Sequence, residues 1–142
     1  GSAIGVAPQA QWIAARIFND RGQSSAVAVH RSFQWLLDPD GNPRTPDAPQ
    51  VVNNSWTFTV PGCDLAFELD LRALRAAGIL PIFAAGNSGP NAGTGMSPAN
   101  NPSALAVGAT DNGAGLYAGS SRGPSSCGTA RGPDGCSNAH PS

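Results

Sequence analysis

The sequence contains no lysine and little charge of either sign. All eight basic residues are arginine, eight of the nine acidic residues are aspartate, and charged residues make up 12% of the chain. Soluble domains usually contain about 25% charged residues. The net charge of −1 also lacks the basic excess that nucleic acids and anionic membranes attract. We therefore expect neither nucleic acid nor a membrane as a partner.

Long apolar runs are absent as well. No stretch approaches the roughly 18 residues of a transmembrane helix, and no basic-then-apolar start predicts a signal peptide in this chain. Hydrophobic residues make up 40% of the 142 residues, which is enough for one domain, or part of one, with a core. The 18 glycines and 13 prolines indicate that loops occupy much of it.

Short apolar segments alternate with helical patterns along the chain. Strands are expected at 11–18, 50–56, 79–85 and 105–110, and helices at 25–37 and 66–77. Gly78 is expected to end the second helix. The predicted buried stripes are Ala26, Val29, Phe33, Leu36 and Leu37 in the first helix, and Leu65, Leu69, Ala73 and Ala76 in the second. This order predicts an α/β fold, a parallel sheet with flanking helices joined by right-handed crossovers.

Two of the expected strands end in polar residues, at 53–56 and 85–90. Ligands of open parallel sheets bind outside the carboxyl ends of the strands. Asn87 follows Gly86 at the second of these ends, where an asparagine commonly serves as a turn residue. An asparagine amide can also donate a hydrogen bond to the oxyanion that develops in acyl transfer. The local residues leave both interpretations open.

Six motifs in order carry a resemblance to a known family. They are Gly5-Val6-Ala7-Pro8, Val52-Asn53-Asn54-Ser55, Ala84-Ala85-Gly86-Asn87-Ser88-Gly89-Pro90, Ser97-Pro98-Ala99-Asn100, Ala106-Val107-Gly108-Ala109-Thr110-Asp111 and Ser120-Ser121-Arg122-Gly123-Pro124-Ser125. The sequence resembles the subtilisin-like serine peptidases (subtilases), closest to their bacillopeptidase F-like branch. The resemblance implies an incomplete subtilisin-like three-layer fold, with 1–125 as the central portion of the peptidase domain and 126–142 as a disordered Gly/Ser/Pro-rich tail.

The resemblance also implies roles for individual residues. Asn87 is expected to be the oxyanion-hole donor, and the substrate backbone is expected to add as an antiparallel strand beside 55–57. Segments 84–86 and 97–99 are expected to form walls of the primary specificity pocket. The expected substrate-binding residues are Ser55, Trp56, Thr57, Ala84, Ala85, Gly86, Ser97, Pro98 and Ala99. The implied partner is a polypeptide substrate, the implied location is extracellular, and the oligomeric state is left open.

The sequence departs from the family pattern at the catalytic triad. The family's aspartate and its His-Gly-Thr-His motif precede the Gly-Val-Ala-Pro segment, and its Gly-Thr-Ser-Met motif follows Ser-Arg-Gly-Pro-Ser; none is found in this chain. Thr57 and Phe58 also stand where the family usually has glycines after Ser-Trp. Two functions therefore remain. One is a fragment of a serine endopeptidase that is inactive alone. The other is a truncated or frame-altered remnant, at most a peptide-binding module.

The remaining candidates for catalysis are weak. His30 lies in the middle of an expected helix, which favours a surface or half-buried histidine over a catalytic base. His140 lies in the expected disordered tail. The serines show no nucleophile elbow of the Gly-x-Ser-x-Gly type.

Two further clusters concern metals and disulfides. Asp38, Asp40, Asn42 and Asp47 share one loop, but no glutamate closes it as in an EF-hand, so a solvated turn is expected. We predict no metal site and no cofactor; calcium is suggested by the family resemblance alone. Cys127 and Cys136 are expected either to bridge, which leaves Cys63 unpaired, or to stay free.

Overall fold

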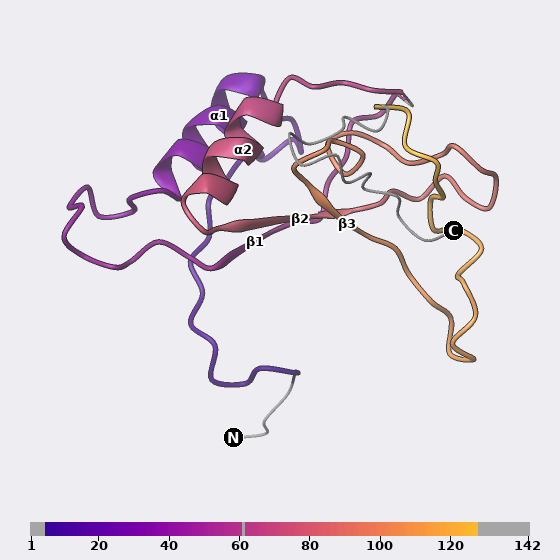
Figure 1. Ribbon diagram of the computed structural model, residues 1–142, viewed down its shortest axis with the longest axis horizontal. Coiled ribbons are helices and arrows are strands. Elements are labelled where there is room, and N and C mark those ends of the chain that lie inside the picture. The colour runs from indigo at the N-terminus through magenta and orange to yellow at the C-terminus, as the bar shows by residue number, and fades with distance from the viewer. Residues whose placement is uncertain (1–4, 61, 128–142) are drawn as a thin grey trace. The chain divides into compact units, whose positions relative to one another are not determined.

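The computed structural model describes residues 5–60 and 62–127 and divides into two compact units, 1–49 and 50–142. The first unit contains helix α1 (Ala26–Trp35). The second contains β1 (Val51–Asn54), α2 (Glu68–Ala76), β2 (Leu80–Ala84) and β3 (Leu105–Val107), as Figure 1 shows. Within the described residues, no helix is both long and apolar enough to span a membrane. The expected tail from 126 onward lies almost wholly outside the described part.

The second unit is built on a parallel sheet, which confirms the predicted α/β class. The strand order is β1-β2-β3, and Asn54 pairs in register with Phe83. Helix α2 packs against β2 and lies on one face of the sheet (Figure 1). Pro81 is fully buried in this central strand, but it is only the second residue of β2. A proline near a strand's start costs the hydrogen-bonded ladder little.

Helix α1 forms within the predicted range. The Ser25 side chain caps its start by accepting a hydrogen bond from the Ala28 N–H at 3.2 Å, which satisfies one of the donors that a helix start leaves free. Val29, Phe33 and Leu36 are buried, as the predicted stripe requires. The two outer members of that stripe, Ala26 and Leu37, are exposed.

Helix α2 ends as predicted. Gly78 has a φ of +82°, a left-handed conformation that favours glycine. Its N–H donates to the Arg75 carbonyl at 3.0 Å, and the Ile79 N–H donates to the Leu74 carbonyl at 2.9 Å. This pair of bonds is a Schellman motif, which satisfies carbonyls at the helix end.

The predicted buried face of α2 is wrong. Leu65 and Leu69 are 49% and 76% exposed, and Ala73 and Ala76 are exposed as well. The buried side chains are Phe67, Leu71 and Leu74. Both sets have helical spacing, so periodicity alone does not choose between them. The stripe with the larger side chains removes more apolar area from water, because alanines contribute little.

The strand predicted at 11–18 is also wrong. This segment is irregular, and Trp12 and Ile13 are 84% and 47% exposed. A strand needs a neighbour that pairs its backbone groups, which apolar composition does not supply. Among the described residues, none pairs with this segment in a sheet. The expected strand at 105–110 shortens to β3, and Thr110 instead forms an isolated antiparallel bridge with Leu116.

A disulfide joins Cys63 to Cys127, with a Cα–Cα distance of 4.7 Å. The expectation that Cys127 pairs with Cys136 or stays free is therefore wrong, as is an unpaired Cys63. The partners are 64 residues apart in sequence, and only the fold brings them together. Cys136 lies outside the described residues.

We predict that Gly89→Ala destabilises the second unit. A Cβ at Gly89 would lie 2.1 Å from the Ser120 carbonyl oxygen and 2.6 Å from that of Ala118, so backbone must shift. Overpacking of this kind costs about 1–3 kcal/mol. Urea unfolding measures the change, and Gly95→Ala is the matched control, since its nearest contact would be 3.7 Å away. Equal midpoints for the two variants would contradict the prediction.

Candidate functional site

The carboxyl end of β1 is fixed by a buried asparagine. The Asn54 side chain donates to the carbonyls of Val52 at 3.3 Å and Ile82 at 3.2 Å, and the residue is only 6% exposed. This amide therefore bridges β1 and β2 at the point where the chain leaves the sheet. Ser55 follows and is exposed, with its hydroxyl accepting a hydrogen bond from the Asn53 amide at 3.1 Å.

The carboxyl end of β2 is a turn that requires glycine. Gly86 has a φ of +110°, and a Cβ there would lie 2.7 Å from Ser121 Oγ. The Gly86 carbonyl accepts from the Ser121 N–H, and Ser121 Oγ accepts from the Ser88 N–H, both at 3.0 Å. These contacts hold the turn on both sides of Asn87, which is exposed. An exposed amide on a fixed turn suits both a turn residue and a hydrogen-bond donor.

Met96 lies between these two strand ends. It is 8% exposed, and its sulfur accepts from the hydroxyls of Thr57 at 3.7 Å and Ser88 at 3.8 Å. A Cβ on Gly86 would also meet the Met96 side chain at 3.3 Å. The sequence did not predict a role for this residue. Its only signal is that a single bulky apolar side chain occurs in a Gly-rich loop, where an apolar residue often packs inward.

Ser97, Pro98 and Ala99 are buried, with exposures of 2% or less. Ser97 Oγ accepts from the Asp64 N–H at 2.8 Å and lies 2.6 Å from Asn100 Oδ1, to which it donates. The Ser97 carbonyl accepts from the Phe58 N–H at 2.8 Å. The Ser97 residue thus holds the 58–64 segment in place. The role of 97–99 as a pocket wall stays a prediction.

An aromatic cluster anchors the chain after β1. The Trp56 ring lies 5.4 Å from Phe83 and 6.0 Å from Phe67, in edge-to-face arrangements. Phe58 lies 5.7 Å from Phe67. Edge-to-face pairs stabilise a fold by more than the burial of their apolar area alone. Phe58, where the family resemblance leads us to expect glycine, is therefore part of the packing that orients segment 55–57.

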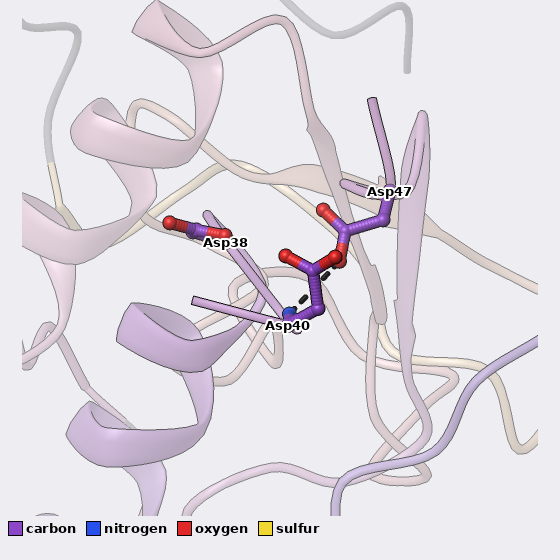
Figure 2. Close-up of side chains that lie close together, drawn as sticks. All are labelled: Asp38, Asp40 and Asp47. Carbon is purple, nitrogen blue, oxygen red and sulfur yellow. Dashed lines mark hydrogen bonds between the residues drawn. The ribbon is translucent and has the colours of Figure 1, made fainter. Parts of the chain in front are cut away.

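Figure 2 shows the acidic loop of the first unit, in which side-chain oxygens of Asp38, Asp40 and Asp47 lie within 4.8 Å of one another. Asp47 Oδ2 accepts from the Asp40 N–H at 2.9 Å, and Asp40 Oδ1 accepts from the Asn42 N–H at 2.8 Å. Two of the carboxylates thus accept hydrogen bonds from the backbone of their own loop, as in the expected turn. The family resemblance suggests calcium without assigning it to this loop.

Of the two histidines, the structure describes one. His30 is half-buried within α1, in the first unit, as the sequence predicts. His140 lies outside the described residues. The predicted site residues of the second unit are Asn87 and the segments 55–57, 84–86 and 97–99. The structure places all of them at the strand ends or on the neighbouring 96–101 turn.

Comparison with known sequences identifies relatives. A profile of the subtilase family matches residues 1–138. Bacillopeptidase F of Bacillus subtilis (strain 168) is 42% identical over 131 residues, which cover 86% of this chain and 9% of that protein. Subtilisin-like protease PopC of Myxococcus xanthus (strain DK1622) is 38% identical over 119 residues, covering 75% of this chain and 25% of PopC. The chain therefore spans a quarter or less of these two relatives.

Solved structures of proteases share the fold of this chain. The S41 psychrophilic protease superposes with a TM-score of 0.61 and 27% identity, over 75% of this chain and 35% of that one. Sphericase superposes with a TM-score of 0.62 and 24% identity, over 75% of this chain and 34% of that one. With the profile match across nearly its whole length, the chain belongs to the subtilase family.

Proposed function

We propose that this chain supplies the substrate cleft and the oxyanion donor of a subtilisin-like serine endopeptidase. The observation that carries the proposal is the turn after β2, where Gly86 and Ser121 fix the backbone on either side of an exposed Asn87. A donor that is fixed before the reaction loses no free energy to reorganisation when the negative charge develops. Family membership supports the same chemistry.

In peptide hydrolysis of this type, a serine hydroxyl attacks the scissile carbonyl while a histidine takes its proton and an aspartate orients the histidine. The carbonyl oxygen becomes an oxyanion. The tetrahedral intermediate then collapses as the C–N bond breaks and the histidine gives its proton to the leaving amine, and water hydrolyses the acyl-enzyme that remains. Asn87 Nδ2 would donate to that oxyanion. Loss of the corresponding donor in subtilisin itself lowers kcat by about 10²–10³, which sets the scale expected for Asn87.

The substrate backbone is proposed to lie beside segment 55–57 as an added strand. Among the described residues, the backbone groups of Trp56 and Thr57 make no hydrogen bond to other backbone groups, so they are available to an extended peptide. The Trp56 ring is held by Phe67 and Phe83. The edge that a peptide would join is therefore fixed before binding, which limits the entropy lost on association.

Secretion is part of the same proposal. The Cys63–Cys127 disulfide suits an oxidising compartment, since cytosolic proteins seldom keep such bonds. The competing hypothesis, a non-catalytic remnant that at most binds peptides, makes a different prediction about the gene. A Gly-Thr-Ser-Met motif in any reading frame downstream of Ser142 supports the endopeptidase, and its absence supports the remnant.

We predict that the purified 142-residue chain neither reacts with a fluorophosphonate probe nor cleaves casein. Acyl transfer needs a nucleophile with a base in hydrogen-bond reach, and loss of triad members lowers turnover by about a millionfold in such enzymes. Mass spectrometry of the probe-treated chain measures labelling. Stoichiometric labelling of any serine in this chain would show that an unrecognised nucleophile is present.

In a longer, active protein that includes this chain and the triad motifs, we expect Asn87→Ala to lower kcat by about 10²–10³ and to leave KM nearly unchanged. The donor acts on charge that exists only in the transition state, so ground-state binding is spared. Asn91→Ala is the matched control, because Asn91 is an exposed residue of the same loop that holds Thr94 through its backbone carbonyl, which the substitution keeps. An unchanged kcat for Asn87→Ala would show that Asn87 does not donate to the oxyanion.

A further inference from the structure

The segment from Phe58 to Asp64 follows the proposed substrate strand and has no helix or strand in its described residues. Hydrogen bonds to the 97–101 turn hold it at both ends. At one end the Phe58 N–H donates to the Ser97 carbonyl at 2.8 Å. At the other, the Asp64 N–H donates to Ser97 Oγ and the Asp64 carbonyl accepts from the Asn101 amide, both at 2.8 Å.

A third segment, 125–127, meets the other two at Asn100. The Asn100 amide donates to the Gly62 carbonyl at 2.9 Å and to Ser126 Oγ at 3.0 Å. The Asn100 carbonyl accepts from the Ser125 hydroxyl at 2.9 Å. The Cys63–Cys127 disulfide then joins the first and third segments covalently.

The disulfide is the accessible part of this junction. Ser97 and Asn101 are only 1% and 3% exposed, whereas Cys63 is exposed and Cys127 is half-buried. A small reductant can therefore approach the cross-link at Cys63, whereas Ser97 and Asn101 are shielded from water. The hydrogen bonds that Asn100 makes with Ser125 and Ser126 lie at exposed positions, where water competes for both partners, so each contributes little to stability.

We propose that the Cys63–Cys127 disulfide is a reducible latch. While closed, it keeps segment 58–64 on the 97–101 turn and thereby fixes the neighbouring segment 55–57; its effect on substrate binding rests on the function proposed above. Opening it frees the described residues of this segment, 58–60 and 62–64, none of which belongs to the sheet. We expect the sheet to stay formed, because it and α2 bury Phe83, Leu71 and Leu74, which belong to β2 and α2 and not to the cross-linked segments.

The opening reaction is thiol–disulfide exchange with a dithiol. A thiolate of the dithiol attacks the sulfur of Cys63 or Cys127, the S–S bond breaks, and the other cysteine leaves as a thiolate that takes up a proton. The second thiol of the reductant then attacks the mixed disulfide and releases the first cysteine. Both cysteines end as thiols, and the dithiol ends as a disulfide.

Hydrogen exchange on the Cys136→Ser chain tests the latch, because in that variant only Cys63 and Cys127 can pair. The amides of Phe58 and Asp64 are followed before and after reduction with dithiothreitol, with thiol titration to confirm that the bond has opened. We expect both amides to exchange at least about tenfold faster after reduction, as in local opening. The Ala85 amide donates to the Val107 carbonyl at 2.9 Å at the carboxyl end of β2, and its exchange rate should not change. Reoxidation should restore the protection of Phe58 and Asp64.

Two results would overturn the latch. One is unchanged exchange at Phe58 and Asp64 after complete reduction. The other is an equal increase at Ala85, which would make the disulfide a support of the whole unit. The double variant Cys63→Ser/Cys127→Ser should reproduce the reduced pattern and ignore dithiothreitol; if it does not fold, the reversible reduction still decides. Hydrogen exchange is measured without proteolytic activity. The latch can therefore be confirmed in an inactive chain, and it can fail in a chain whose proposed proteolytic function is correct.

Discussion

Ser97 is the residue on which the arrangement of the candidate site depends. Its carbonyl holds Phe58 and its hydroxyl holds Asp64, so one buried residue fixes both ends of a segment that lacks regular structure. A buried hydroxyl without partners would destabilise the fold, whereas one with both roles satisfied specifies a single loop geometry. The sheet of the second unit has three short strands among the described residues. Contacts between loops therefore fix the chain here, as longer strands and helices do in other folds.

The sheet brings the two strand ends of the candidate site together but supplies no reactive side chain itself. The register that pairs Asn54 with Phe83 makes β1 and β2 end side by side, and the Asn54 amide joins them there. The chain after β1 is then oriented by aromatic packing, and the chain after β2 by a turn that only glycine allows. Met96 lies between them. The proposed peptide-binding edge and the proposed oxyanion donor thus come from neighbouring strand ends, where ligands of parallel sheets bind.

The sequence predicted features that depend on local chemistry. These include the parallel α/β class, the range that contains helix α1, and the end of α2 at Gly78. It failed where the outcome depends on distant partners: the unpaired segment 11–18, the buried face of α2, and the bond between Cys63 and Cys127. Asn87 and the pocket-wall segments came from motif order and stay predictions, because their roles appear only with a substrate. Met96 carries only the weak signal of an apolar side chain in a Gly-rich loop, and the Asn100 junction carries none, since both arise from loop packing.

We propose that the ends of β1 and β2, together with residues 96–97, form one peptide-binding cleft. Amide chemical-shift mapping during titration with an extended peptide tests it most directly, since it requires no catalysis. The largest shifts at saturation should fall on Trp56 and Thr57 and on the turn from Gly86 to Ser88, with Met96 also affected. Saturable binding whose shifts cluster in the 5–49 unit, or no shift at Trp56 and Thr57, would contradict the claim.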